Sequence, residues 1–266
     1  MSGNRHFTTG DGCRIAYRID GADDRPVLVL SNSIATNLQM WDRSVAALSR
    51  SFRLLRYDTR GHGGSDAPVG AYSMDRLGRD VVELLDALNI DRAHFLGLSL
   101  GGFIGQWLGI FAPERIDRLI LSNTSAYLAS ELHFDDQIRA VLEAPDMNGI
   151  ADGFMRNWFP ATMLAGPNEI VDEFRNMVLT TAPRGLAGCF AALRDVDLRR
   201  AISLIAAPTL VIGGESDAVT RPSHSEAITA TIANARLVLL PGVHILNVEQ
   251  AERFNSEVLG FLESAP

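Results

Sequence analysis

The sequence predicts an α/β protein, in which helices cover both faces of a mostly parallel β-sheet and an all-helical cap is inserted late in the chain. Short apolar runs alternate with longer amphipathic segments over residues 26–122 and 208–263. Such alternation indicates βα units and a parallel sheet. Strand-like runs are missing between these two stretches. We therefore expect a core formed by residues 1–123 and 198–266, and a helical cap formed by residues 124–197.

The first half of the chain supplies most of the expected strands. A glycine turn at residues 10–12 predicts a hairpin, and the apolar run PVLVLS at residues 26–31 is typical of a strand buried on both faces. Ser73 can cap a helix that ends near Leu88. The expected strands of this half are residues 5–9, 13–20, 26–31, 52–57, 92–98 and 118–122, and the expected helices are residues 40–48, 73–88 and 100–111.

Prolines divide the segment that is expected to form the cap. They stand at positions 145, 160, 167 and 183, so this segment should fold as several short amphipathic helices. After the cap, strands are expected at residues 208–212 and 236–240, and helices at residues 223–232 and 250–263. Ligands bind at the carboxyl edge of open α/β sheets, and we expect the cap to cover that edge.

Composition and charge exclude several classes of function. The formal net charge is −8, which argues against a nucleic-acid partner. All 24 basic residues are arginine, so a catalytic lysine is excluded. Cys13 and Cys189 fit no metal or redox spacing, and no apolar run approaches the roughly 18 residues of a membrane span. We expect a soluble cytoplasmic protein without a membrane partner, metal or cofactor.

Gly97-Leu98-Ser99-Leu100-Gly101 is the stretch around which the chain is organised. It is expected to end a buried strand, turn sharply on Ser99 and begin a helix. Glycine is required on both sides, because the strand and the helix approach closely there. The turn would expose the Ser99 hydroxyl and place the Leu100 N–H at a helix N-terminus, where a developing negative charge is stabilised.

A serine nucleophile needs a base, and His244 is the candidate among six histidines. His244 follows the expected strand 236–240, which places it at the same sheet edge as Ser99. Asp217 follows the strand 208–212 and is the candidate for the acid that orients the imidazole, with Glu215 as its rival. In some enzymes of this architecture the acid follows the preceding strand, where this chain has Asn123.

These residues resemble the α/β-hydrolase superfamily. The order Ser99, Asp217, His244 is that of its catalytic triad, and the stretch from Asp58 to Ser65, DTRGHGGS, is similar to its D-x-R-G-x-G-x-S loop. Where relatives carry His-Gly after the third strand, this chain has Asn32-Ser33.

Two backbone donors of an oxyanion hole are implied by that resemblance. The first is the Leu100 N–H. With Trp41 as the register mark, the second is the Ile34 N–H, and an alignment error of one residue would make it the Ser33 N–H.

Longer stretches are similar to the 3-oxoadipate enol-lactonases of aromatic catabolism. They are SNSI at residues 31–34, LSNT at residues 121–124 and GLAGCFAALRD at residues 185–195. The resemblance implies that Ser99 opens a small anionic lactone through an acyl-enzyme in the β-ketoadipate pathway, without a cofactor. A charged carboxymethyl arm is costly to bury without a partner.

Two cap residues are therefore expected to bind substrate. Arg139 is our candidate for the partner of the arm, ahead of the cap arginines at positions 156, 175, 184 and 194. Trp158 is the candidate for a pocket wall, although it can equally pack within the cap.

Other functions remain open from the sequence. Another carboxylesterase, lactonase or carbon–carbon bond hydrolase would use the same triad beneath a different cap pocket. A non-catalytic ligand-binding protein of this fold would be expected to have lost part of the triad, which is complete here. A haloalkane dehalogenase would carry aspartate at the position of Ser99. Oligomeric state leaves no signal in the sequence.

Overall fold

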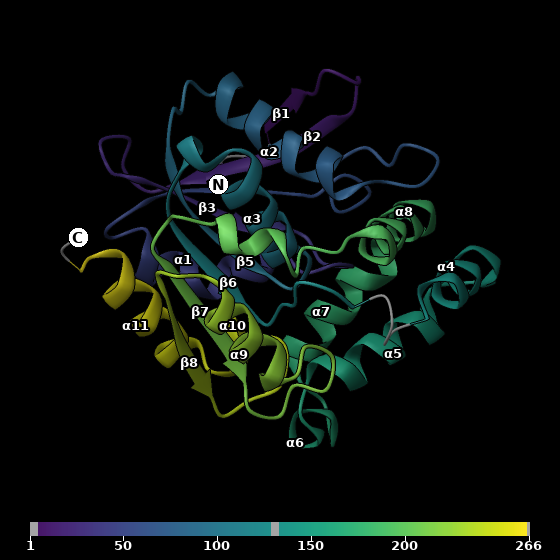
Figure 1. Cartoon of the computed structure of the whole chain (residues 1–266). Coiled ribbons are helices and arrows are strands. Elements are labelled where there is room, and N and C mark those ends of the chain that lie inside the picture. Colours follow the sequence, from purple (N-terminus) through teal and green to yellow (C-terminus); the bar gives the residue numbers. More distant parts are fainter. Residues whose placement is uncertain (1–4, 129–132, 265–266) are drawn as a thin grey trace.

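The computed structural model describes residues 5–128 and 133–264. Within them, eight strands form one sheet in the order β1-β2-β4-β3-β5-β6-β7-β8 (Figure 1). β1 and β2 form the expected antiparallel hairpin, β2 pairs antiparallel with β4, and all other pairs are parallel. The strands are β1 (Arg5–Thr8), β2 (Arg14–Asp20), β3 (Val27–Ser31), β4 (Arg53–Tyr57), β5 (Ala93–Leu98), β6 (Ile116–Ser122), β7 (Thr209–Gly214) and β8 (Ala235–Leu240).

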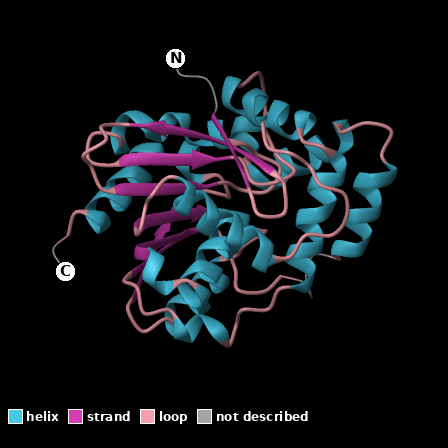
Figure 2. Ribbon diagram, turned by 90° about the horizontal axis from the view of Figure 1, so that it is seen from above, coloured by secondary structure: helices cyan, strands magenta, loops and turns pink. Residues whose placement is uncertain are grey.

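Helices cover both faces of the twisted sheet (Figure 2), as the sequence predicts. α3 packs on β5, β6 and α2, while α1 packs against α11. The helices of the core are α1 (Asp42–Leu48), α2 (Met74–Ala87), α3 (Leu100–Phe111), α9 (Pro222–Thr231), α10 (Leu246–Glu249) and α11 (Ala251–Leu262). Short 3₁₀ turns span Leu38–Trp41, Pro113–Arg115 and Ala201–Leu204.

The start of α2 follows a local signal in the sequence, whereas two other helix boundaries do not. The Ser73 hydroxyl accepts a hydrogen bond from the Arg76 N–H over 3.1 Å, and so caps α2 as predicted. The expected helix 40–48 is divided, because Leu38–Trp41 form a 3₁₀ turn that precedes α1. α10 was not predicted, since its four residues are too few to show a helical periodicity.

The inserted segment between β6 and β7 is all-helical in its described part and forms a cap at one side of the core (Figure 1). Three of its helices begin just after prolines 160 and 167 and at Pro183, which are three of the four positions where the sequence predicts breaks. The cap helices are α4 (Phe134–Glu143), α5 (Asn148–Trp158), α6 (Ala161–Leu164), α7 (Glu169–Thr180) and α8 (Pro183–Asp195). α4 packs on α8, and α5 packs on α7.

The predicted domain boundaries include some residues outside those described, namely 129–132 of the cap and 1–4 and 265–266 of the core. All five cap helices lie between residues 124 and 197. None of the helices in the described residues is long and apolar enough to cross a bilayer.

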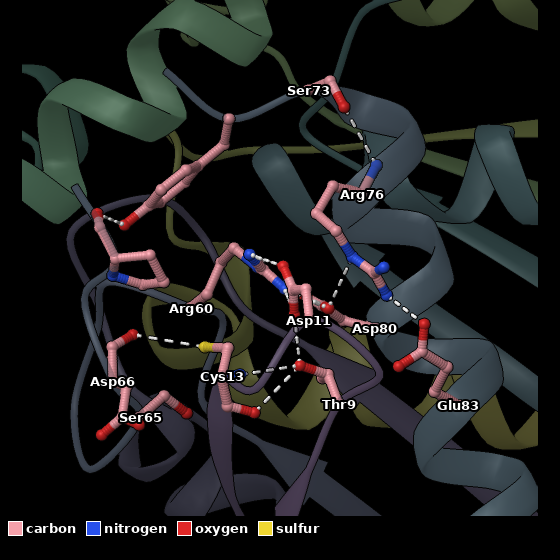
Figure 3. A network of polar contacts seen from close by, with 12 residues as sticks. Thr9, Asp11, Cys13, Arg60, Ser65, Asp66, Ser73, Arg76, Asp80 and Glu83 are labelled. Carbon is pink, nitrogen blue, oxygen red and sulfur yellow. Dashed lines mark hydrogen bonds and ion pairs between the residues drawn. The ribbon is translucent and has the colours of Figure 1, made fainter. Parts of the chain in front are cut away.

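An ionic network with a buried centre at Arg60 and Asp80 holds the loop after β4 against α2 and the β1–β2 turn (Figure 3). Arg60 is nearly inaccessible to solvent, and two of its nitrogens lie 2.6 Å from the carboxylate oxygens of Asp80 on α2. Asp11, in the β1–β2 turn, accepts from Arg60 over 2.9 Å. Arg76 joins Asp80 over 3.1 Å and also pairs with Glu83. The network therefore fixes the position of the glycine-rich loop 58–66.

Candidate active site

Ser99 lies at the sharp turn between β5 and α3. Its backbone has φ +58° and ψ −113°, a conformation that L-residues rarely adopt, and the residue is partly exposed. A Cβ at Gly97 would come within 2.0 Å of the Gly101 carbonyl oxygen, and one at Gly101 within 2.3 Å of the Ser31 carbonyl oxygen. Both contacts are impossible for a real side chain, so glycine is required on each side of the turn, as the sequence predicts.

Asp217 and His244 form a buried pair at the same edge of the sheet. Asp217 follows β7 and His244 follows β8, and Asp217 Oδ2 lies 2.7 Å from His244 Nδ1. Both side chains are almost completely buried. Glu215, the rival acid of the sequence analysis, is exposed. The structure thus brings Asp217 to the histidine, and this geometry suits an acid that orients an imidazole.

Hydrogen bonds from three sides keep the Asp217 carboxylate charged. Burial raises its pKa, but the charge and hydrogen bond of His244 and the hydrogen bonds from Asn123 and the Thr220 N–H outweigh this effect and lower the pKa to about 2. Asn123 Nδ2 donates to Asp217 Oδ2 over 3.0 Å, and the Thr220 N–H donates to Oδ1 over 3.0 Å. The Val219 N–H also donates to Oδ1, over 2.9 Å.

Asn123 is a site residue whose role the sequence analysis missed. It directly follows β6, and β6 pairs with β7, so it lies beside Asp217 at the strand ends. Its backbone has φ +44°, and the Ser122 hydroxyl donates to its Oδ1 over 2.7 Å, which turns Nδ2 toward Asp217. The signal in the sequence that could have indicated this role is the position of Asn123 directly after the strand β6.

The two expected oxyanion donors are both available. The Leu100 N–H is at the first residue of α3, and the Ile34 N–H lies in the loop after β3. Among the described residues neither amide has a hydrogen-bond partner. The neighbouring Ser33 N–H, in contrast, donates to Met40 Sδ over 3.3 Å. The structure therefore favours Ile34 over the alternative Ser33.

Ser99 and His244 line one cavity of about 90 Å³ between the core and the cap. Ile34 and Val219 belong to the core side of this cavity, and α4, α5 and α8 supply most of the cap side. Its full lining is Ile34, Ser99, Leu128, Phe134, Gln137, Phe154, Asn157, Trp158, Phe190, Leu193, Val219 and His244. The cap therefore covers the carboxyl edge of the sheet. We call this cavity the reaction pocket.

Trp158 lines the reaction pocket and also packs within the cap. Its ring centroid lies 4.7 Å from that of Phe154 and 6.2 Å from that of Phe174. Its carbonyl oxygen accepts a hydrogen bond from the His244 N–H over 3.3 Å. Trp158 therefore agrees with both interpretations of the sequence, because it forms part of the pocket wall and also packs within the cap.

Arg139 is not brought to the reaction pocket. Its side chain is 64% exposed on α4 and lies 3.5 Å from Asp136, one turn away on the same helix. It is absent from the described lining of the pocket, because that face of α4 is turned to solvent. In its place Gln137 and Asn157 contribute neutral amides to the lining, and the described lining includes no arginine.

A second cavity of about 180 Å³ lies beside the reaction pocket within the cap. It shares Gln137, Phe154, Asn157 and Phe190 with that pocket, and its remaining lining is from α4 and α5. Among the described residues, no group of three or more His, Cys, Asp or Glu side chains is arranged to hold a metal ion.

The fold and this arrangement of side chains match a known family. The family described as "alpha/beta hydrolase fold" matches residues 26–251. The chain therefore belongs to this family, and is a hydrolase.

Two relatives of known name match almost the whole chain. A 3-oxoadipate enol-lactonase of Acinetobacter baylyi is 37% identical, covering 94% of this chain and 93% of its own length. A putative carbamate hydrolase, RutD, of Rhizobium rhizogenes is 31% identical, covering 93% of this chain and 97% of its own. Within the family, the chain resembles the enol-lactonases.

Two crystal structures superpose closely on the whole chain. A hydrolase from Pseudomonas aeruginosa has a TM-score of 0.97 at 54% identity, with 98% of each chain covered. The enol-lactonase from Burkholderia xenovorans has a TM-score of 0.94 at 38% identity, covering 98% of this chain and 100% of that one.

Proposed function

We propose that this protein hydrolyses 3-oxoadipate enol-lactone to 3-oxoadipate in the catabolism of aromatic compounds, with Ser99, His244 and Asp217 as a catalytic triad. One observation carries the proposal: Ser99 lines a cap-covered pocket together with a histidine that a buried aspartate holds over 2.7 Å. The similarity to enol-lactonases supports the choice of substrate. More generally, the chain is a hydrolase that acts on ester or lactone bonds.

In the first half of the reaction, Ser99 Oγ attacks the lactone carbonyl carbon and His244 takes the serine proton. Asp217 remains ionised, because its pKa is about 2, and it stabilises the imidazolium that forms. The Leu100 and Ile34 N–H groups hold the oxyanion. Each such donor contributes about 100- to 1000-fold in rate, and neither has another partner among the described residues.

Ring opening then breaks the bond between the carbonyl carbon and the ring oxygen. His244 returns its proton to that oxygen, and the released enol tautomerises to a ketone. The whole substrate remains attached to Ser99 as an acyl group. Water, deprotonated by His244, cleaves this ester and releases the product as a keto acid.

The acid arm of the lactone needs polar partners in the reaction pocket. We propose that the side-chain amides of Gln137 and Asn157 donate to its carboxylate, since Arg139 lies outside the pocket. Neutral amides can satisfy the hydrogen bonds of a carboxylate, whereas an unpaired buried charge is costly.

Carbamate hydrolysis is the second candidate, because relatives named as putative carbamate hydrolases match over 93% of this chain. The same triad would attack a carbamate carbonyl.

As for location, we propose the cytoplasm, and the two buried free thiols of Cys13 and Cys189 support a reducing compartment.

Steady-state hydrolysis of three substrates tests the proposal. The enol-lactone should have a kcat/KM at least about 100-fold above those of a simple carbamate and of phenyl acetate, a gap of roughly 2.7 kcal/mol. Ser99→Ala should abolish all three activities. Ser203→Ala, at a solvent-exposed position outside the cap, should change none of them. A preference for the carbamate would select the second candidate.

A further inference from the structure

The loop that carries the Ile34 N–H has an unusual backbone. Residues 32–36 follow β3, and Ala35 has φ +59°, a value that non-glycine residues seldom adopt. Hydrogen bonds must therefore hold the loop in place. The Ser33 carbonyl, which shares a peptide plane with the Ile34 N–H, accepts from the Thr36 hydroxyl over 2.7 Å. One of the two peptide planes at Ile34 is thus fixed by Thr36.

His62 fixes the other peptide plane at Ile34, which contains the Ala35 N–H. The Ala35 N–H donates to His62 Nε2 over 2.9 Å, and His62 Nδ1 lies 3.2 Å from the Arg60 carbonyl oxygen. An amide N–H can only donate and a carbonyl can only accept, so these contacts require a neutral ring with its proton on Nδ1. Burial lowers the pKa of His62 to about 4, which leaves the ring neutral near pH 7.

His62 is itself held by the ionic network of Figure 3. Arg60, two residues earlier, is bound by Asp80 and Asp11, which ties the loop 58–66 to α2 and to the β1–β2 turn. The next residue, Gly61, lies so close to Gly185 of α8 that a Cβ at Gly61 would approach the Gly185 Cα to 2.6 Å. The imidazole therefore has a rigid support outside the reaction pocket, whose described lining does not include His62.

We infer that His62 is a positioning residue for catalysis, which aims the Ile34 N–H at the oxyanion by accepting the hydrogen bond of the Ala35 N–H. This inference rests on the proposed serine-hydrolase function. The hydrogen bonds of the His62 ring within the described residues go to Ala35 and Arg60, and His62 is not part of the described lining of the reaction pocket. Its loss should therefore reduce the stabilisation of the transition state while substrate binding is retained, and kcat should fall while KM changes little.

Two substitutions distinguish the contributions of the two ring nitrogens of His62. His62→Gln can place its side-chain oxygen near the position of Nε2 and so keep an acceptor for the Ala35 N–H. His62→Asn reaches only the position of Nδ1 and leaves that N–H without a partner. We expect His62→Asn to lower kcat for the enol-lactone by about 10- to 100-fold, less than the loss of a whole oxyanion donor. KM should stay within about threefold, and His62→Gln should retain most of kcat.

Three outcomes would overturn the inference. They are an unchanged kcat in His62→Asn, an equal loss of kcat in both variants, and a loss that appears in KM alone. Ser99→Ala is measured in parallel: if it is as active as the wild type, the proposed function fails, whereas an inactive Ser99→Ala beside a fully active His62→Asn rejects only the role of His62.

The tautomer of His62 provides a second test, which is made on the wild-type protein and needs no activity measurement. Nitrogen NMR of the histidine rings, with the His62 signal identified by its loss in His62→Gln, should show a neutral ring protonated on Nδ1 between pH 6 and 8. A ring protonated on Nε2 cannot accept from the Ala35 N–H and would overturn the inference.

Discussion

Asn123 and Asp217 meet at the ends of two neighbouring strands, where Asn123 Nδ2 donates to Asp217 Oδ2 over 3.0 Å. The same amide also donates to the Val243 carbonyl over 3.0 Å, next to His244. Asn123 therefore joins the segments that follow β6, β7 and β8. An amide at position 123 stabilises the ionised carboxylate of Asp217 by donating a hydrogen bond to it. A second carboxylate at this position would repel that charge instead.

Asn123→Asp should test this relationship with almost no change in shape. A second carboxylate beside Asp217 would raise the pKa of Asp217 and favour a proton shared between the two acids. We expect kcat to fall by about 10- to 100-fold, with the larger loss at low pH, because a shared proton weakens the hold on His244. The measurement is the kcat profile from pH 5 to pH 9. An unchanged profile would mean that Asn123 does not influence the acid.

The choice of acid is tested by a matched pair of substitutions. Asp217→Asn should lower kcat by about 10⁴-fold, because the imidazole loses its orienting carboxylate. Glu215→Gln, at an exposed position two residues earlier, should have almost no effect. The reverse pattern would show that the acid has been assigned to the wrong residue.

Asn157 and Arg139 separate two accounts of how the acid arm is bound. Asn157→Leu keeps the branched shape of the side chain but removes the amide, and should lower kcat/KM for the enol-lactone by about 10- to 100-fold, or roughly 1.4–2.7 kcal/mol. Phenyl acetate, which has no acid arm, should be affected far less. Arg139→Ala should change neither substrate. If Arg139→Ala selectively impaired the lactone, the arm would reach the surface of α4 instead.

Removing Asp80 should destabilise the fold. Asp80→Ala leaves the buried Arg60 guanidinium with only Asp11, and breaking a buried pair in this way costs about 3–5 kcal/mol. Urea unfolding would measure this loss. Asp136→Ala, which removes the exposed pair with Arg139, serves as the control and should cost at most about 1 kcal/mol. Equal effects of the two substitutions would contradict the structural role of the network.

The sequence predicts best those parts of the site that depend on a local signal. The turn at Ser99 is marked by Gly97 and Gly101, whose missing side chains the structure explains directly. The order of strands placed Asp217 and His244 at one edge, because the carboxyl ends of parallel strands meet there. These features need only neighbouring residues and the alternation of strands and helices.

Roles that depend on how side chains meet in the folded chain could not be predicted from the sequence. Arg139 lies on the expected cap helix, but the packing of α4 on α8 turns it toward solvent. The choice between Ser33 and Ile34 depends on a contact with Met40 Sδ, seven residues further along the chain. His62 is one of the five histidines that the sequence does not favour as the base, and only the folded chain brings its ring to the Ala35 N–H.

The proposed function requires that the lactone acylates Ser99, and mass spectrometry after rapid quenching tests this step most directly. During turnover of 3-oxoadipate enol-lactone, the peptide that contains Ser99 should gain the mass of the whole ring-opened substrate. The adduct and the turnover should both disappear in Ser99→Ala and persist in Ser203→Ala. Turnover by a folded Ser99→Ala protein, or an acyl group on any other residue, would contradict the account.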